Sequence, residues 1–571
     1  MIYLAALLML GAFAFSCNKI DRQDRTPEEN TQLISPVEMT FTATMAAKDA
    51  STRSVDADGV TTWEVDEKIA VYYQKSDDSY GTATANVDAV NTGVATISAS
   101  LISAKNGGTV KFVYPASLVN ATGDDIDAAK LQANQHGTIA DISASFDAAT
   151  GSGTLVTDGI TCGTDATVTL TNRVLIGKFT PKYSGAAIDE IATLTVSDGT
   201  NTYIVTPTSG TFGTTGIYVA MLPVSSQVVS LAAETASASY LYPGNSVTLA
   251  AGKLYNNLAI AMAKDLSASA TANTYMVSAA GYYAFNATVK GNGGLDPLTG
   301  LTATTIDPAD IAGVSVLWEL YGQGRAIKHN GSSYNISYSD GYVYFSTPDS
   351  FTPGDACVAI YDSSDNILWS WVIWATPEPS TMTHNTKTFM DRNLGAINVD
   401  NCMRGFLFEW GRKDAFSAAN GGYDVYPYVP VASSVFTHSN GSASTMAYTV
   451  THPTEWIRPS TDYSWMSSAS EYGAKPWRVD VKTIYDPCPA GWRIPTKENI
   501  TGITGLPNTG ICGGYDPSET YKGFGNPNKG YYWTASTDDG NDDRAYAFCN
   551  DGRDINHWGQ DQGYAIRPVR E

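Results

Sequence analysis

Five of six consecutive residues near the C-terminal end of the sequence carry side-chain oxygen atoms. They are Asp538, Asp539, Asn541, Asp542 and Asp543. Carboxylate and amide oxygens are the ligands that a hard cation such as Ca²⁺ prefers. The run lacks the fixed spacing of an EF-hand loop, and a solvated acidic turn is the simpler interpretation. The composition therefore allows a calcium site that the spacing does not support, and no other cofactor is expected.

Trp558 is the residue whose type best suits stacking on a sugar ring. It follows His557 and precedes a polar stretch, 559–562. Packing into the protein core is the alternative, because a single tryptophan near a terminal strand usually buries its ring. Trp558 is therefore a test residue for ligand binding.

No residue pattern of a known catalytic centre is present in the sequence. The six histidines are scattered, and no GxSxG, HExxH or phosphate-cradling glycine loop occurs. Carboxylate pairs are too frequent in so acidic a chain to single out any one pair. We expect a protein that is not an enzyme, and an envelope hydrolase is a hypothesis that no motif supports.

Cys17 predicts a different chemistry, the attachment of lipid. It closes the segment AFSC after an apolar run at 2–15, which is shorter than the roughly 20 residues of a membrane-spanning helix and typical of a signal sequence. We predict a lipoprotein signal peptide at 1–16, thioether and acyl lipid (palmitate) on Cys17, and a polar tether at 17–35. A plain signal peptide with an incidental cysteine is the alternative, because no Lys or Arg precedes the apolar run.

Length and charge narrow the class of protein. A chain of 571 residues is expected to form three or four domains. The formal net charge of −22 argues against nucleic acid as a partner. Seven cysteines without a CxxC motif are too few for a disulfide scaffold.

The first half of the sequence has the pattern of short antiparallel strands. Apolar and polar residues alternate at 69–73, 110–114, 192–196, 216–222 and 254–262, and turn residues separate these runs. This spacing predicts β-sandwiches.

Four ordered motifs in this half resemble the fimbrillin family of Bacteroidetes lipoprotein pilins. They are MTFTA (39–43), TRS (52–54), VTTW (60–63) and EKIAVY (67–72). The resemblance implies two transthyretin-like β-sandwiches at 36–155 and 156–265, each a fimbrillin-like domain. It also implies that a protease removes the first strand and that a strand from another pilus subunit fills the open sheet edge, since such edges accept strands through main-chain hydrogen bonds.

Arg53 is the matching candidate for this proteolytic maturation, with Arg25 and Arg22 as alternatives. The other interpretation is that Arg53 lies in an exposed turn that is never cut.

Residues 266–380 predict an Ig-like β-sandwich. Segments 276–278 and 282–285 are expected to form a hairpin around Gly281, and strands are expected at 314–320 and 342–345. The run ILWSWVIW (367–374) is apolar on both faces, which predicts a strand buried on two sides. The segment PEPS (377–380) predicts a linker.

The last part, 381–571, resembles the Fibrobacter succinogenes major paralogous domain. The motifs are FMDRNLGA (389–396), GFLFEWGRKD (405–414), YDPCPAGWRIPT (485–496) and YYWTAST (531–537). The resemblance implies a C-type lectin-like α+β domain with long ligand-binding loops, although the sugar-binding triplets of C-type lectins are absent. Thr496 is expected to cap a short helix that ends early at Gly502.

The chain departs from this family at Pro568, where a cysteine is expected. Cys488 would therefore pair with Cys549 or Cys512, or remain a free thiol; an oxidising envelope permits either bond.

Together these features predict a mainly β protein of tandem sandwiches followed by an α+β lectin-like domain. We expect a surface-exposed lipoprotein of the cell outer membrane that joins a fimbrium as a pilus-tip or accessory adhesin, because some 300 residues follow the two fimbrillin-like sandwiches. Its partners would be other fimbrillin-like subunits, by donor-strand exchange, and a host or bacterial surface glycan or protein. The alternative is a glycan-binding surface lipoprotein outside any pilus.

Overall fold

The computed structural model has half of its residues in strands and 8% in helices. This confirms the mainly β fold class predicted from the sequence. The structure describes residues 4–7, 37–44, 64–91, 94–157, 162–164, 168–302, 304–320, 325–397, 405–417, 437–440, 442–459, 463–506, 530–538, 540–550 and 554–571.

The chain divides into two compact units, Met1–Met262 and Ala263–Glu571. The predicted finer boundaries, at 155, 265 and 380, stay predictions.

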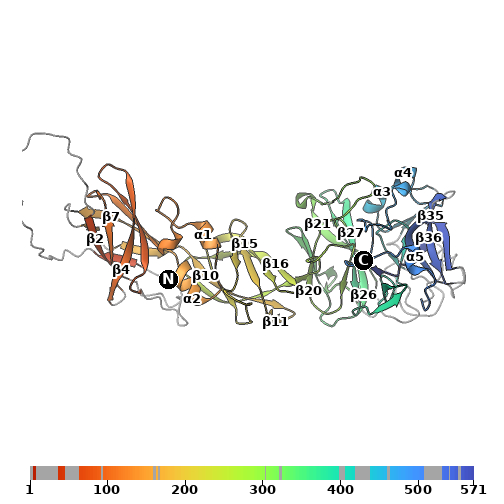
Figure 1. Cartoon of the computed structure of the whole chain (residues 1–571), viewed down its shortest axis with the longest axis horizontal. Coiled ribbons are helices and arrows are strands. Elements are labelled where there is room, and N and C mark those ends of the chain that lie inside the picture. The colour runs from red at the N-terminus through yellow and green to blue at the C-terminus, as the bar shows by residue number, and fades with distance from the viewer. Residues whose placement is uncertain are drawn as a thin grey trace, which may run out of the picture. The chain divides into compact units, whose positions relative to one another are not determined.

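The first sheet of the N-terminal unit is built from the strands that alternate in sequence. Its strands, in chain order, are β1 (Leu4–Leu7), β2 (Val37–Thr44), β3 (Lys68–Gln74), β4 (Tyr80–Asn91), β5 (Val94–Leu101), β6 (Thr109–Tyr114), β7 (Ala149–Thr157), β8 (Cys162–Thr164) and β9 (Val168–Asn172). Their spatial order is β1-β9-β7-β6-β3-β4-β5-β2-β8, with further pairings β1–β2 and β7–β8. The sheet therefore curls back on itself around apolar side chains such as Ile69, Ile97 and Phe112 (Figure 1).

Two further sheets of this unit face one another as a sandwich. One joins β10 (Leu175–Tyr183) to β11 (Ala186–Ala187), β14 (Ile217–Met221) and β17 (Leu254–Ala261). The other has the order β13 (Thr202–Val205), β12 (Thr193–Ser197), β15 (Val224–Glu234) and β16 (Ser239–Leu249). The five strands expected from alternation, at 69–73, 110–114, 192–196, 216–222 and 254–262, are all present.

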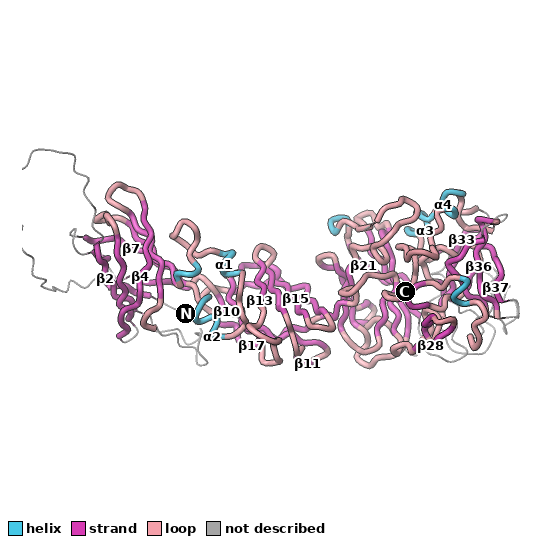
Figure 2. Tube along the Cα trace, viewed as in Figure 1, coloured by secondary structure: helices cyan, strands magenta, loops and turns pink. Residues whose placement is uncertain are grey.

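The segment between β6 and β7 connects the first sheet to this sandwich. It carries η1 (Ala116–Leu118), α1 (Ala128–Gln132), α2 (Ile139–Asp141) and η2 (Ile142–Phe146), drawn as short cyan pieces in Figure 2. Leu131, Ile142 and Phe146 belong to the core of the sandwich. The buried side chain of Gln135 accepts a hydrogen bond from the Ala220 N–H and donates to the Ala220 carbonyl, both at 2.8 Å. The N-terminal unit is thus one packed body.

The C-terminal unit begins with two facing sheets. One has the order β18 (Ala263–Asp265), β20 (Tyr282–Asn286), β25 (Tyr342–Ser346) and β24 (Ile336–Ser339). The other has the order β19 (Thr274–Val277), β27 (Ile367–Ala375), β26 (Gly354–Tyr361) and β21 (Gly313–Leu320). The strands expected near 314–320 and 342–345 are confirmed, and β27 is buried along its last seven residues as its sequence predicts.

The hairpin expected around Gly281 is wrong. Strand β19 pairs in parallel with β27, whereas β20 pairs with β18 and β25 in the opposite sheet. The turn therefore carries the chain from one layer to the other. In separate layers the apolar faces of the two strands pack against each other across the core, where the rings of Tyr275 and Phe285 stack.

Residues 381–571 add small sheets and short helices to this unit. The sheets are β28 (Thr381–His384), β29 (Lys387–Met390), β39 (Val569–Arg570) and β34 (Trp492–Arg493); β31 (Phe416–Ser417), β30 (Phe406–Glu409) and β38 (Gly563–Tyr564); β32 (Thr437–Asn440) and β33 (Glu455–Arg458); and β35 (Tyr531–Asp538), β36 (Asn541–Cys549) and β37 (Asp554–Gly559). The helices are α3 (Met446–Thr451), α4 (Ala469–Gly473) and α5 (Lys497–Ile500). Thr496 caps α5 with a capping box, and the helix ends before Gly502, as predicted.

Buried hydrogen bonds join this last part to the preceding sandwich. The Asn273 amide donates to the carbonyls of Ile484 at 2.6 Å and Asp486 at 2.9 Å, and accepts from the Trp369 indole N–H at 2.9 Å. The Trp374 indole N–H donates to the Ala396 carbonyl at 3.2 Å. These contacts explain why residues on both sides of the expected 377–380 linker form one compact unit.

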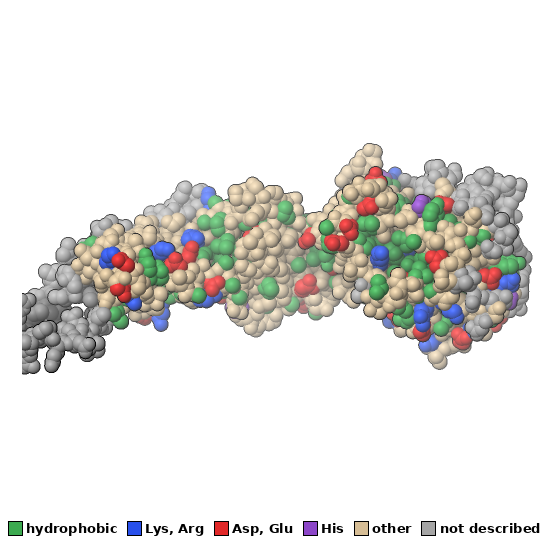
Figure 3. Space-filling model, turned by 90° about the horizontal axis from the view of Figure 1, so that it is seen from above, with side chains coloured by type: hydrophobic (Ala, Val, Ile, Leu, Met, Phe, Trp, Pro, Cys, Tyr) green, Lys and Arg blue, Asp and Glu red, His purple; other side chains and the backbone are tan. Residues whose placement is uncertain are grey.

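Among the described residues, no helix is both long enough and apolar enough to cross a membrane. On the face seen in Figure 3, the acidic and basic side chains of the described residues form small separate groups. The described residues on that face form no broad basic patch of the kind that binds nucleic acid.

Candidate functional site

Strand β2 is paired with other strands along both of its edges in the first sheet. It pairs antiparallel with β5 over eight residue pairs, from Val37↔Leu101 to Thr44↔Val94. On its other edge it pairs with β1 and meets β8 through Met39↔Cys162. β2 thus supplies the main-chain partners of one whole edge of β5, whose other edge is paired with β4.

Cys17 and the three arginine candidates, Arg22, Arg25 and Arg53, lie outside the described residues. The position of β2 in the sequence nevertheless distinguishes the three arginine candidates. Arg22 and Arg25 precede β2, and Arg53 follows it. Only a cut after Arg53 would separate β2 from the rest of the chain.

The acidic run lies at the hairpin between β35 and β36. Asp538 is buried, with 9% of its surface exposed, and its carboxylate lies 2.7 Å from Nδ1 of His557. Asp539 and the side chains of Asn541 and Asp542 are not described, and Asp543 is half-buried. Within the described residues, no three His, Cys, Asp or Glu side chains gather as a metal site would require. A calcium site here stays a prediction without structural support.

Trp558 lies in β37 and is half-buried. It meets Tyr531 and Tyr564 edge to face, with ring centroids 5.6 Å and 6.2 Å apart. These contacts favour the core-packing interpretation. Its role in ligand binding stays a prediction.

The cysteine pairing also stays a prediction. Cys488 is a buried free thiol, and burial raises its pKa well above the ordinary value. Cys549 is buried at the end of β36. Cys512 lies outside the described residues.

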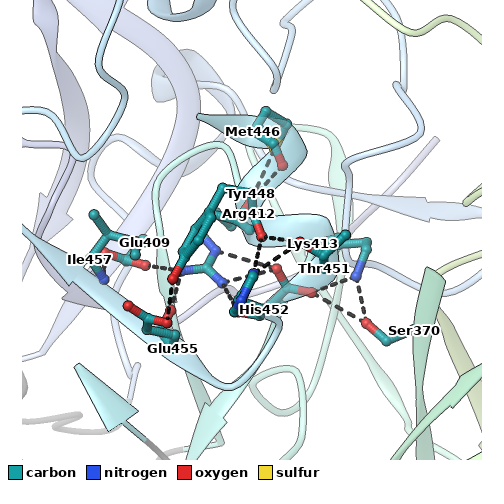
Figure 4. Close-up of polar contacts among 12 residues, drawn as sticks. Ser370, Glu409, Arg412, Lys413, Met446, Tyr448, Thr451, His452, Glu455 and Ile457 are labelled. Atoms are coloured by element: carbon teal, nitrogen blue, oxygen red, sulfur yellow. Dashed lines mark hydrogen bonds and ion pairs between the residues drawn. The ribbon is translucent and has the colours of Figure 1, made fainter. Parts of the chain in front are cut away.

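The motif EWGRKD (409–414) forms a buried ion network that sequence reasoning did not assign. Arg412 is fully buried; it pairs with Glu409 and, at 3.1 Å, with Asp414, and donates to the Glu455 carbonyl at 2.8 Å. Lys413 pairs with Asp414. Figure 4 shows Glu409, Arg412 and Lys413 of this network. The signal in the sequence was four charged residues adjoining the apolar run FLF (406–408).

This network is closed to solvent and extends into the preceding sandwich. Lys413 donates at 2.6 Å to the hydroxyl of Ser370 in β27, and its ammonium lies 4.8 Å from the Trp369 ring centroid. Burial raises the pKa of Glu409, while the Arg412 guanidinium and the Ile457 N–H partly offset that rise. Because its two cations and two carboxylates are buried and mutually paired, the network suits a structural role better than acid–base catalysis.

No family model and no curated protein sequence matches this chain. Among solved structures, it aligns with a candidate cell adhesion protein from Parabacteroides distasonis at 11% identity and a TM-score of 0.19, over 44% of this chain and 87% of the other. It also aligns with a fimbrial protein from Bacteroides ovatus at 11% identity and a TM-score of 0.21, over 95% and 99% of the two chains. At TM-scores this low the alignments carry no argument about fold or function.

Proposed function

We propose that this chain is a cell-surface fimbrial subunit, in a pilus-tip or accessory position, that mediates attachment through residues 381–571. The observation that supports the proposal is the place of β2. This strand completes the first sheet and precedes the arginine, Arg53, after which the fimbrillin resemblance expects a cut.

A cut after Arg53 would leave one edge of β5 without its partner strand. That edge pairs with β2 over eight residues, a length of about 26 Å at roughly 3.3 Å per residue. Unpaired main-chain groups on such an edge are satisfied by an added strand. The partner in this proposal is a strand from another fimbrillin-like subunit.

The pairing of β39 in the C-terminal unit supports acceptance without donation. Strand β39 pairs with β29 through Phe389↔Val569 and with β34 through Trp492↔Arg570. A strand held on both edges within its own unit is not available to complete a neighbour. This arrangement suits a tip or accessory position better than a stalk position.

In this proposal, lipidation of Cys17 determines how the chain is exported to the outer membrane. Lipid on Cys17 would hold the precursor at the cell surface, and a cut after Arg53 would release the chain from that lipid together with β2. The finished subunit would then be held by its pilus partner, and its ligand would be a surface glycan or protein.

The proposal is tested by following the full chain through limited digestion with an arginine-specific protease. We expect a cut after Arg53 and a product that stays monomeric by light scattering, because the cut opens an acceptor edge while β39 is paired on both of its edges. Beads coated with the full chain should attach to host or bacterial surfaces that uncoated beads do not bind.

The variant Arg53→Gln is the matched control, since it should keep β2 attached under the same digestion. Fibres formed by the cut protein alone would contradict the tip or accessory position. Attachment by a chain that is never cut at Arg53 would instead favour a surface lipoprotein outside any pilus.

A further inference from the structure

We infer that an open groove in the C-terminal unit binds a sugar that carries a carboxylate. This inference rests on the proposed attachment function and names its ligand class. The groove has a volume of about 500 Å³, within the range of small-ligand sites. We call it the basic groove; it is lined by Gly473, Ala474, Lys475, Trp477, Arg478, Val479, Asp480, Lys497, Glu498, Ala535, Ser536 and Thr537.

Three cationic side chains line the basic groove, and two of them pair with no carboxylate of the described residues. Arg478 is held by Asp480 through two hydrogen bonds, of 2.9 Å and 2.7 Å. Neither Lys475 nor Lys497 forms an ion pair with any residue that the structure describes; the Lys497 ammonium lies 4.4 Å from the Tyr546 ring centroid. Two ammonium groups thus remain to bind an anion.

The net charge of the whole chain does not decide which ligand enters. Three cations against two carboxylates leave the basic groove with one net positive charge, although the chain carries −22. Charges beyond about 8 Å are largely screened at physiological salt. The local balance therefore favours an anionic ligand.

The remaining wall groups favour a sugar over a simpler anion or an acidic peptide. Asp480 and Glu498 can accept hydrogen bonds from ligand hydroxyls, and they would repel a ligand with several negative charges, such as a run of acidic side chains, more than a ligand with a single carboxylate. Ser536 and Thr537 add hydroxyl groups on the wall. Val479, which is 49% exposed, offers apolar surface to the C–H face of a sugar ring. One carboxylate among many hydroxyls matches this mixture of groups.

The walls of the basic groove are fixed before any ligand binds. Arg493 donates at 2.6 Å to the carbonyl of Arg478, and the backbone N–H of Lys497 donates at 3.1 Å to the Ser536 hydroxyl. Trp477 is buried and donates its indole N–H to the Tyr485 carbonyl at 2.9 Å. Preorganised walls reduce the conformational entropy lost on binding.

The test is calorimetric titration of the full chain with a galacturonic acid trisaccharide, a neutral galactose trisaccharide and hexa-aspartate. We expect the acidic sugar to bind at least tenfold more tightly than the other two probes. The double variant K475Q/K497Q should weaken it at least tenfold, and the exposed control K387Q, with one charge removed elsewhere in the same unit, should leave it unchanged. Because both lysines are only half-buried, circular dichroism should show that the double variant keeps its fold.

Equal binding of the acidic and neutral sugars, equal binding of hexa-aspartate, or unchanged affinity in K475Q/K497Q would each overturn the inference. The bead-attachment assay separates this failure from that of the proposed function. If K475Q/K497Q beads attach as well as wild-type beads, the basic groove is not the attachment site while the fimbrial proposal stands. If the groove binds the acidic sugar but wild-type beads attach to nothing, the proposed attachment function fails.

Discussion

Buried charges in the C-terminal unit fall into two kinds. The EWGRKD network pairs each charge with an opposite one, so Arg412 and Glu409 tolerate complete burial. Asp355 is different: it is fully buried in β26, and neither carboxylate oxygen has a hydrogen-bond partner among the described residues. Glu409 and Asp355 are both acidic residues in the sequence. The difference in the pairing of their carboxylates depends on tertiary contacts that no local pattern encodes.

We predict that Asp355 makes the free energy of unfolding fall as pH rises. Burial raises its pKa well above 3.8 in the folded protein, so the unfolded chain releases this proton at lower pH than the folded one. The contribution of Asp355 to the free energy of unfolding is complete below about pH 4. It falls by up to about 1.4 kcal/mol per pH unit as the pH rises toward the pKa of Asp355 in the folded protein. Denaturant titrations from pH 4 to 8 measure this slope.

Asp355→Asn should remove the decrease in the free energy of unfolding that Asp355 causes as the pH rises. The exposed control Asp310→Asn should retain that decrease. Parallel pH profiles for wild type and D355N would contradict the prediction.

Strands were the elements that sequence alone could locate. Period-two alternation marks β3, β6, β12 and β14, because it reports a half-buried strand directly. It does not report the partner strand, and the hairpin expected between β19 and β20 is wrong for that reason. The apolar run in β27 predicts its burial, but its pairing with β19 and its contact with the 381–571 part depend on residues far away in sequence.

Asn273 is predicted to couple these distant elements. It is 2% exposed and bonds the carbonyls of Ile484 and Asp486 and the indole of Trp369. Asn273→Ala would leave these groups buried without that partner, so we expect the free energy of unfolding of the C-terminal unit to fall by about 3 kcal/mol. Chemical denaturation followed by tryptophan fluorescence measures the loss.

The exposed residue Asn330 supplies the matched control, and Asn330→Ala should change stability by less than about 0.5 kcal/mol. A change that small in Asn273→Ala would show that the two parts of the unit do not depend on this contact.

At the scale of the whole molecule, the alternation of apolar and polar residues predicted the mainly β class, and ordered motifs suggested a fimbrial subunit. The candidate sites were less predictable. The acidic run and Trp558 stand out by residue type, yet Asp538 contacts His557 and Trp558 packs against tyrosines. The basic groove could not be predicted from the sequence. Its residues come from 473–480, 497–498 and 535–537, which only the fold brings together.

The central claim is that β2 is a removable strand whose place another strand can take. Amide hydrogen exchange of β5, followed by mass spectrometry, tests it most directly in the full chain, after the cut at Arg53, and after adding a peptide of residues 36–46. The account predicts protected β5 amides before the cut, faster exchange after it, and restored protection with the peptide. Unchanged exchange of β5 after the cut, or fast exchange that the peptide does not slow, would contradict it.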